Sequence, residues 1–302
     1  MPSVSPRRLP PPDLLLDARV DLGEGPMWHP ARRLVSWVEL YEGRVHWLRL
    51  DGTAAGTVDV PRRVGAAVPG ADGTLVLAAD EGFARLREGD SYELLAPVEP
   101  AGADSFMNDG KCDASGRFWA GTVGVREDGL AADRAGALYC LEPDRTVRRV
   151  LSGVSLSNGM DWSPDGGTFY YVDSRLSWID AFTFDLAAGE LGGRRSIELG
   201  LPAGAFVDGM CVDADGCLWT AIWGTGEVRR YTPAGELDTV LPVPVTQPTS
   251  CAFAGDDLDV LVITSARRTL TEARLEREPH AGGVFACRPG SSGFPPHPCR
   301  AA

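Results

Sequence analysis

Residues 212–219 read VDADGCLW, a short turn that leads into an apolar strand. The Asp-Gly pair marks the turn, because glycine readily adopts the positive φ that tight hairpin turns need. The apolar residues that follow are typical of a buried strand. A similar succession returns at residues 28–37, 68–77, 112–119, 162–171 and 253–261. A repeated unit of turn and strand therefore organises this sequence.

A second repeat follows the first. Its copies alternate apolar and polar residues, which is the pattern of a half-exposed antiparallel strand. They lie at residues 43–48, 82–86, 136–141, 178–182, 226–231 and 283–287. Both repeats return about every 40–50 residues, and no stretch has a sustained helical period. The pattern predicts an all-β fold, a six-bladed β-propeller with four-stranded antiparallel blades.

The length of 302 residues fits one propeller domain, expected over residues 14–290. Residues 1–13 are proline-rich and lack the apolar core of a secretion signal, so we expect a disordered leader there. Residues 291–302 are expected to form a flexible tail. No apolar run approaches the roughly 18 residues of a membrane helix.

The composition of the chain disfavours some classes of binding partner and metal site. A formal net charge of −13 disfavours nucleic acid, which requires a basic surface. Most of the seven cysteines lie inside or beside apolar strand patterns, and none forms a CxxC pair. Buried free thiols in the reducing cytoplasm are the favoured interpretation. The four histidines are too scattered for a histidine-based zinc site.

Three segments share an oxygen-bearing residue that stands four positions before a core residue, with glycine directly after it. They are EGPMW, NGMDW and DGMCV, beginning at Glu24, Asn158 and Asp208. In a closed repeat fold, equivalent positions converge on one axis. Converging carboxylate and amide oxygens, without thiols or imidazoles, predict a site for one divalent cation. Ca²⁺ is favoured, with Zn²⁺, Mn²⁺ and Fe²⁺ left open.

The same position carries Asn108 in a fourth blade and falls near Gly65 and Thr249 in the other two. Asn108 could bind the metal through water or hold a substrate hydroxyl. Asp109 is either a turn residue or, as we favour, a carboxylate that orients its neighbours. Residues 173–174 are interpreted as a loop, with a pocket edge as the alternative.

Other catalytic machinery is absent from the sequence. No Gly-x-Ser-x-Gly elbow, Walker loop or dinucleotide fingerprint lies between a strand and a helix. With only four histidines, the sequence offers few candidates for the base of a serine–histidine triad. Any chemistry must therefore come from the metal and its carboxylates.

Six stretches together resemble the gluconolactonase/regucalcin family (senescence-marker-protein-like) of six-bladed β-propeller lactonases. They are residues 22–28, 108–113, 157–162, 208–210, 247–253 and 261–267. The resemblance spans about residues 15–290. It implies that Glu24, Asn158 and Asp208 bind the metal. It also implies that Asn108 contacts the substrate or a metal-bound water, and that Asp208 is the general base.

Two departures from the family pattern concern the substrate. Family members that act on gluconolactone often have an arginine where this chain has Phe106. They also carry an acid in the loop after residues 121–122, where this chain reads VGVRE. We expect Phe106 to present an aromatic face to the substrate and Arg126 to contact it from another side. Pentonolactones or a deoxy-sugar lactone then become alternatives to gluconolactone.

These observations predict a metal-dependent hydrolase that opens a sugar lactone to the aldonic acid. The cation would stabilise charge on the carbonyl oxygen while water attacks the carbon. Either Asp208 takes the proton directly, or a metal-bound hydroxide attacks with Asp208 as proton relay. An organophosphate or other ester hydrolase and a non-catalytic calcium-binding propeller are the alternatives. The expected partner is a small lactone, with no membrane or nucleic acid, and the expected state is a monomer or weak homodimer.

Overall fold

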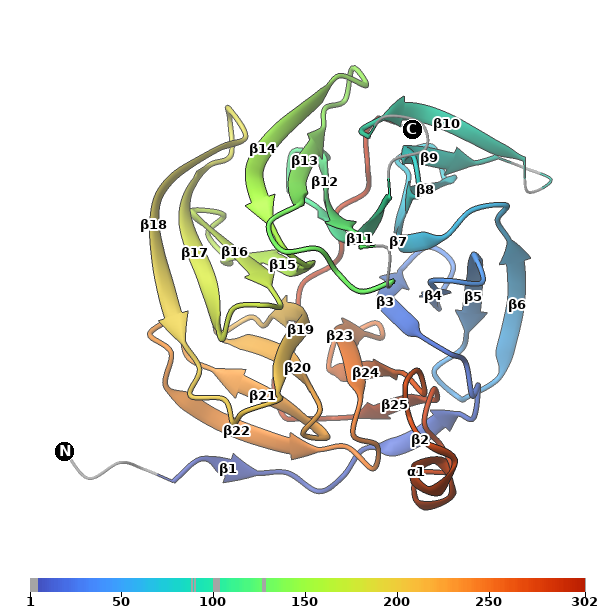
Figure 1. The fold of residues 1–302 in the computed structure, drawn as a ribbon, viewed down its shortest axis with the longest axis vertical. Helices are drawn as coiled ribbons and strands as arrows, with labels where there is room; N and C mark the ends of the chain where they lie inside the picture. Colours follow the sequence, from blue (N-terminus) through green and yellow to red (C-terminus); the bar gives the residue numbers. More distant parts are fainter. Residues whose placement is uncertain (1–4, 88, 90, 100–103, 127–128, 302) are drawn as a thin grey trace.

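Six β-sheets surround a central axis, and each runs outward from an inner strand (Figure 1). The computed structural model describes residues 5–87, 89, 91–99, 104–126 and 129–301. Consecutive strands along the chain pair as antiparallel neighbours, which is how a repeated turn-and-strand unit folds. The predicted six-bladed β-propeller is confirmed.

In blades 1 to 3, the strands follow one another along the chain from the axis to the rim. Blade 1 holds β3 (Gly23–His29), β4 (Leu34–Glu39), β5 (Arg44–Leu48) and β6 (Ala54–Asp59). Blade 2 holds β7 (Val64–Pro69), β8 (Leu75–Ala79), β9 (Gly82–Leu86) and β10 (Tyr92–Pro97). Blade 3 holds β11 (Ser105–Cys112), β12 (Phe118–Gly124), β13 (Gly136–Leu141) and β14 (Val147–Val154).

The other three blades follow in the same order. Blade 4 holds β15 (Ser157–Trp162), β16 (Thr168–Asp173), β17 (Trp178–Asp185) and β18 (Glu190–Glu198). Blade 5 holds β19 (Phe206–Val212), β20 (Leu218–Trp223), β21 (Glu227–Tyr231) and β22 (Leu237–Pro242). Blade 6 holds β23 (Pro248–Ala254), β24 (Val260–Ser265) and β25 (Val284–Cys287).

Blade 6 is completed by a strand from the other end of the chain. β2 (Asp13–Leu16) pairs antiparallel with β25, so one sheet joins the first and last parts of the propeller. β1 (Arg7–Arg8) adds to blade 5 in parallel with β22, and Leu9 after it is buried. Residues 7–13 thus pack on two blades instead of forming the expected disordered leader. Residues 1–4 of that leader lie outside the described residues.

The C-terminal segment crosses one end of the propeller instead of forming the expected flexible tail. The Ala214 N–H donates to the Ser292 carbonyl at 2.7 Å, and the Cys299 N–H donates to blade 2. Cys299 is fully buried. The segment can be followed in Figure 1 as the red trace that passes behind the centre toward blade 2. Residues 291–301 are thereby held at both ends, and Ala302 lies outside the described part.

A buried aspartate holds the turn that the sequence repeats. The Oδ1 atom of Asp213 accepts the N–H groups of Asp215 and Cys217 at 3.0 and 2.9 Å. Its Oδ2 atom accepts the Nε1–H of Trp219 at 2.9 Å. Asp113 bonds the equivalent backbone groups and tryptophan in blade 3. In blades 3 and 5, the aspartate therefore ties the turn to the strand that follows it.

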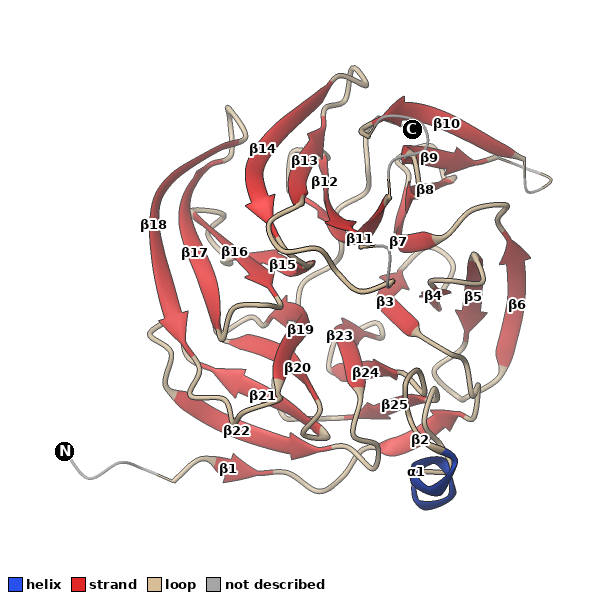
Figure 2. Cartoon of the chain, viewed as in Figure 1, coloured by secondary structure: helices blue, strands red, loops and turns tan. Residues whose placement is uncertain are grey.

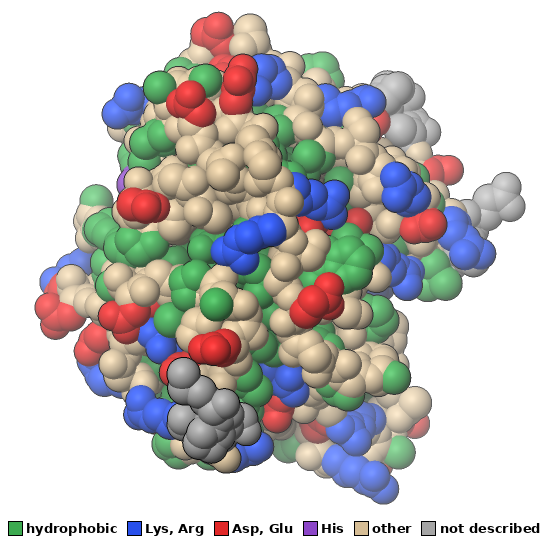
Figure 3. Space-filling model, turned by 90° about the vertical axis from the view of Figure 1, so that its left-hand side faces the viewer, with side chains coloured by type: hydrophobic (Ala, Val, Ile, Leu, Met, Phe, Trp, Pro, Cys, Tyr) green, Lys and Arg blue, Asp and Glu red, His purple; other side chains and the backbone are tan. Residues whose placement is uncertain are grey.

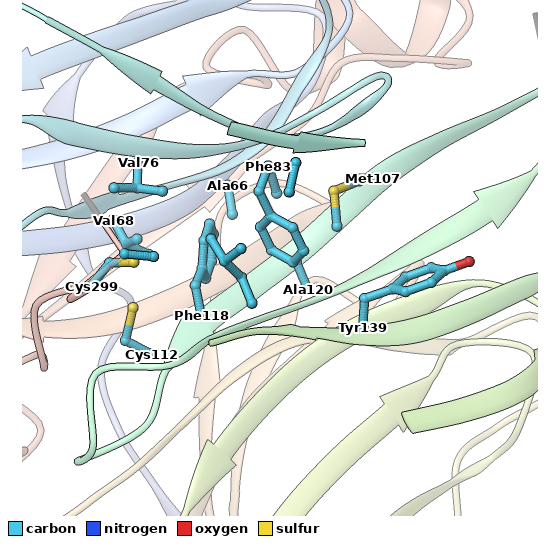
Figure 4. Close-up of a cluster of buried hydrophobic side chains, with 14 of the residues drawn as sticks. Ala66, Val68, Val76, Phe83, Met107, Cys112, Phe118, Ala120, Tyr139 and Cys299 are labelled. Atoms are coloured by element: carbon cyan, nitrogen blue, oxygen red, sulfur yellow. The ribbon is translucent and has the colours of Figure 1, made fainter. Parts of the chain in front are cut away.

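Apolar side chains fill the wedges between blades. Between blades 2 and 3, the rings of Phe83 and Phe118 meet edge to face with centroids 5.3 Å apart. Met107 and Cys112 from the inner strand of blade 3 join them. Figure 4 shows that Cys299 from the C-terminal segment enters the same cluster beside Cys112. Burial of this thiol adds to the hydrogen bonds that hold the segment on the propeller.

The described residues contain one helix, α1 (Glu272–Arg277), which lies beside blade 6 (Figure 2). Its N-cap is Thr271, whose hydroxyl accepts the Arg274 N–H at 3.3 Å. Six residues are too few to show a helical period in the sequence. No helix in the described residues has the length and apolar character needed to cross a membrane.

All seven cysteines are free thiols and six are buried, as expected from their apolar surroundings. On the flank shown in Figure 3, acidic and basic side chains are interspersed with apolar ones. That face carries no continuous stripe of one charge.

Candidate metal centre

The inner strands of all six blades lose register with the next strand at one level of the channel. The shifts fall between Glu24 and Met27, Val64 and Ala66, Met107 and Gly110, Ser157 and Met160, Val207 and Met210, and Pro248 and Ser250. Such bulges bend a strand and redirect its side chains. The six positions expected to be equivalent lie at or within these shifts.

Contacts between neighbouring inner strands close these positions into a ring. The Asn108 Nδ2–H donates to the Ser157 carbonyl at 2.7 Å, which links blades 3 and 4. The Thr249 Oγ1–H donates to the Gly23 carbonyl at 2.5 Å, which links blades 6 and 1. Blades 4 and 5 approach so closely that a Cβ on Gly159 would lie 2.7 Å from the Asp208 carbonyl oxygen. The bulged backbones therefore surround one narrow point on the axis.

Glu24, Asn158 and Asp208 are buried in this ring, with 5%, 3% and 7% of their surfaces exposed. The Oδ1 atoms of Asn158 and Asp208 have no hydrogen-bond partner among the described residues. Glu24 Oε2 accepts only a long bond of 3.3 Å, from the neighbouring Gly25 N–H. Buried acceptors without donors are costly, so this ring of oxygens calls for a positively charged partner.

Burial also raises the pKa values of the Glu24 and Asp208 carboxyl groups. Burial raises the pKa of Glu24 well above its ordinary value, and the charges of Asp208 and Asp109 raise it further. Burial also raises the pKa of Asp208; the charge of Asp109 adds to this rise, and the Asn158 amide opposes it. Without a cation, each charge in this site destabilises the others. A divalent ion would reverse that balance.

The chemistry of these residues fits a hard divalent cation. Two carboxylates and one amide supply oxygen ligands, and the amide and one carboxylate each leave an oxygen unpaired. In the described part of the chain, no three His, Cys, Asp or Glu side chains gather as a metal site. The candidate centre therefore depends on Asn158 as its third ligand.

Ser174 orients that amide. The Asn158 Nδ2–H donates to the Ser174 Oγ at 3.0 Å, which leaves the amide oxygen unpaired. Asp173, the residue before it, accepts the N–H groups of Ser155 and Leu156 and so shapes the loop into blade 4. The loop interpretation is wrong for Asp173, which is the last residue of β16, and right for Ser174, which lies in the turn directly after that strand. Through its bond to Asn158, Ser174 also borders the site, in line with the alternative of a pocket edge.

Asn108 and Asp109 occupy different levels of the channel. Asn108 is 8% exposed, and its Nδ2–H donates to the Ser157 carbonyl of blade 4. Asp109 Oδ1 accepts the Gly110 N–H at 2.7 Å. Asp109 also lines a void of about 10 Å³ deeper in the channel, together with Lys111. Burial raises the pKa of Asp109 to about 6, although the charge of Lys111 lowers it. The charge of Asp109 thus raises the pKa of the two candidate carboxylate ligands, Glu24 and Asp208.

Phe106 lies in an apolar cluster near the ring, packed with Leu40 and Val123. The guanidinium of Arg63 stacks over its ring at 4.6 Å, and the ring of Tyr41 meets it at 60°. Only 6% of Phe106 is exposed, so packing accounts for most of its contacts.

Arg126, the other residue expected to grip the substrate, is exposed at a turn. Its N–H donates to the Leu130 carbonyl at 2.8 Å. The turn is closed by an isolated bridge between Val125 and Ala131, two residues that pack against the Phe106 cluster. The backbone of Arg126 thus belongs to the loop beside Phe106, while its side chain lies outside the buried ring.

Replacing Asp109 by asparagine tests these electrostatics in metal-free protein. A carboxyl with a folded pKa of about 6 and an unfolded pKa near 3.8 costs stability above pH 6 and nothing below about pH 4. We expect Asp109→Asn to raise the free energy of unfolding at pH 7.5 by about 1–3 kcal/mol and to be neutral at pH 4. Urea unfolding at both pH values measures this. An equal effect at both would contradict it. The titrations of buried His29 and half-buried His46 are common to both proteins and cancel, whereas Glu24 and Asp208 lose the neighbouring charge of Asp109, which acts in the same direction as the main effect.

Comparisons with known proteins show the family of this chain. A family model described as "SMP-30/Gluconolactonase/LRE-like region" matches residues 22–267, a range that includes Glu24, Asn158 and Asp208. Regucalcin from Gallus gallus is 36% identical over 286 residues, covering 93% of this chain and 95% of that protein.

Two solved structures share the fold over most of their length. The regucalcin of Agrobacterium tumefaciens, described as a calcium-binding protein, superposes with a TM-score of 0.91 at 28% identity, covering 97% of this chain and 99% of that one. A gluconolactonase from Xanthomonas campestris superposes with a TM-score of 0.72 at 26% identity, covering 90% and 87%. By its sequence and its fold, this chain belongs to the SMP-30/gluconolactonase/LRE-like family.

Proposed function

We propose that this protein hydrolyses a sugar lactone to the corresponding aldonic acid with the help of one divalent cation. The observation that carries the proposal is the pair of buried, unpartnered oxygens on Asn158 and Asp208 beside the Glu24 carboxylate. Membership of a family that includes a gluconolactonase supports the reaction class. All-oxygen ligands favour Ca²⁺, and a family relative is described as calcium-binding.

Glu24, Asn158 and Asp208 would hold the cation, which supplies charge stabilisation for the carbonyl oxygen. Asp208 acts as general base and takes a proton from the attacking water. The water oxygen bonds to the carbonyl carbon, the ring C–O bond breaks, and the proton passes to the ring oxygen. Ser174 keeps the Asn158 amide oriented throughout. The product is a hydroxy acid, which balances lactone plus water.

The apolar cluster around Phe106 bears on the choice of lactone. An aromatic ring covered by Arg63 stands where gluconolactone-specific relatives often place an arginine. A ring packed in this way supplies no hydrogen bonds to sugar hydroxyls. The surroundings of Phe106 thus favour a pentonolactone or deoxy-sugar lactone over gluconolactone.

The test is lactone hydrolysis by protein stripped of metal and reloaded anaerobically with Ca²⁺, Zn²⁺, Mn²⁺ or Fe²⁺. The substrates are hexono- and pentonolactones and one aryl phosphotriester, and reactions without enzyme give the background. We expect turnover of a lactone with at least one cation and none without. Turnover of the phosphotriester alone would favour the rival hydrolase. Tight cation binding without any turnover would leave a calcium-binding propeller, which the description of the Agrobacterium relative also fits.

A further inference from the structure

A larger cavity lies at the other end of the central channel from the candidate metal centre. Its volume is about 570 Å³, and its wall includes Trp28, Trp162 and Phe253. These residues lie near the ends of their inner strands, whereas Glu24 and Asn158 lie near the starts. Equivalent points of the inner strands meet at one level of a propeller, so the two sites lie at different ends of the channel. We call this space the distal cavity.

The C-terminal segment leaves an aromatic ring open in the wall of the distal cavity. Phe294 lines the cavity and is 39% exposed. The segment is anchored on both sides of it, because the Gly293 N–H donates to the Leu258 carbonyl at 2.9 Å and the Cys299 N–H donates to the Pro69 carbonyl at 2.7 Å. The ring is thus held beside the cavity without being buried. A preformed cavity of this size with apolar walls falls within the range of small-molecule sites.

The charged groups of the distal cavity have a negative balance. The charged side chains that line it are the ammonium of Lys111 and the carboxylates of Asp161 and Asp165, so one positive and two negative charges leave a net charge of −1. Lys111 is paired with Asp161, since its Nζ lies 2.8 Å from Asp161 Oδ2. The charge of Asp165 is therefore the one that this pair does not balance.

Asp165 lies at an exposed turn between β15 and β16 and has a free oxygen. Its Oδ1 accepts the Ser163 O–H at 2.6 Å and the Gly167 N–H at 3.0 Å, and its Oδ2 accepts no hydrogen bond from the described residues. The Ser163 hydroxyl hydrogen is used in this bond. His297, which also lines the cavity, offers one donor and one acceptor when neutral.

The deeper pair keeps more acceptor than donor capacity as well. Asp161 Oδ2 accepts Lys111 and the Val212 N–H, but Oδ1 accepts only the Trp162 N–H at 2.9 Å, although a carboxylate oxygen can accept two bonds. Lys111 also donates to the Met210 carbonyl at 3.2 Å, which leaves it at most one further N–H. A ligand that enters the distal cavity therefore has to bring donors and a positive charge.

We propose that the distal cavity binds a small aromatic amine in its cationic form. The ammonium donates to Asp165 at the rim, where exposure to water keeps the cost of desolvation low. The ring packs against Phe294 and Phe253 and buries apolar surface that Phe294 exposes in the empty cavity. Lys111 also lines the void of about 10 Å³ in the channel, so the two positive charges lie at different depths. The cavity shares no lining residue with the three candidate metal ligands, and this inference is independent of the proposed lactonase activity.

Isothermal titration calorimetry of the full chain with 2-naphthylmethylamine at neutral pH tests the proposal. We expect one binding event per chain. 2-Naphthylmethanol has the same ring without the charge, so it should bind about 2–10-fold more weakly, the range of one charged hydrogen bond at a partly exposed site. 2-Naphthoate should bind more weakly still. Absence of amine binding, or equal affinity for the alcohol or the carboxylate, would overturn the proposal.

The first variant tests the contact with the ammonium. Asp165→Asn removes the charge and keeps an oxygen that can accept the Ser163 and Gly167 bonds, so amine affinity should fall about 2–10-fold while alcohol affinity is unchanged. Asp144→Asn is the matched control. Asp144 makes the same kind of exposed turn outside the cavity, accepting the Thr146 N–H and hydroxyl, and its variant should bind the amine as wild type does.

The second variant tests the contact with the ring. Phe294→Ala removes the open ring of the wall, so affinity for both the amine and the alcohol should fall about 2–10-fold, the effect of one aromatic contact. Phe206→Ala is the matched control, because Phe206 is 38% exposed and does not line the cavity. Wild-type amine affinity in either Asp165→Asn or Phe294→Ala would place the ligand elsewhere and overturn the assignment.

Discussion

Asp208→Asn should abolish metal-dependent lactone hydrolysis while leaving the propeller folded. Loss of a general base typically costs about 10²–10⁴-fold in rate, and the same change also weakens cation binding. The fold should survive, because the native carboxylate is buried with one oxygen unpartnered and its pKa is raised by burial. Asparagine removes that charge and keeps the shape. The measurements are kcat on the preferred lactone, cation affinity by calorimetry, and Tm without metal.

Asp215→Asn is the matched control for Asp208→Asn. It removes a carboxylate seven residues along the chain, from a side chain that is 72% exposed and paired with Arg230. We expect its kcat and cation affinity to equal those of wild type. If Asp208→Asn retained wild-type turnover, Asp208 could not be the base. If it bound the cation normally, it could not be a ligand.

The propeller could be predicted because its repeat has a local cause. Asp113 and Asp213 each bond their own turn and the tryptophan six residues later, so the sequence pattern and the structure coincide. The contacts that the two terminal segments make with the propeller have no such local sequence signal. β1, β2 and Cys299 pair with residues more than two hundred positions away, and only tertiary packing selects those partners. A proline-rich or irregular stretch therefore looked disordered.

The candidate site could be predicted in part, for a related reason. Glu24, Asn158 and Asp208 occupy equivalent points of a repeat, and six bulged strands bring equivalent points together. Ser174 sits outside that repeat register, so its bond to Asn158 depends on how one loop folds back. The packing of Phe106 under Arg63 likewise joins blades 2 and 3. The sequence of neither blade alone predicts this contact.

Asp213→Ala should strongly destabilise the propeller, although Asp213 lies outside the site. Asp213 is fully buried and accepts hydrogen bonds from two backbone N–H groups and the Trp219 indole. It also pairs with Arg230, whose Nε lies 2.7 Å from Oδ2. Truncation leaves these donors unpaired in the core, and losing one partner of a buried ion pair typically costs about 3–5 kcal/mol. We expect Tm to fall by about 5–10 °C in a thermal unfolding scan.

Asp144→Ala separates the buried network from the turn itself. Asp144 makes the same kind of turn, accepting the Thr146 N–H and hydroxyl at 3.0 and 2.7 Å, but at an exposed position without an indole. Its loss should shift Tm far less, because water replaces the missing acceptor. Equal shifts in the two variants would mean that turn formation alone stabilises the blades. A larger shift for Asp213→Ala would assign the stability to the buried bonds with Trp219 and Arg230, which tie the inner turn of blade 5 to its next two strands.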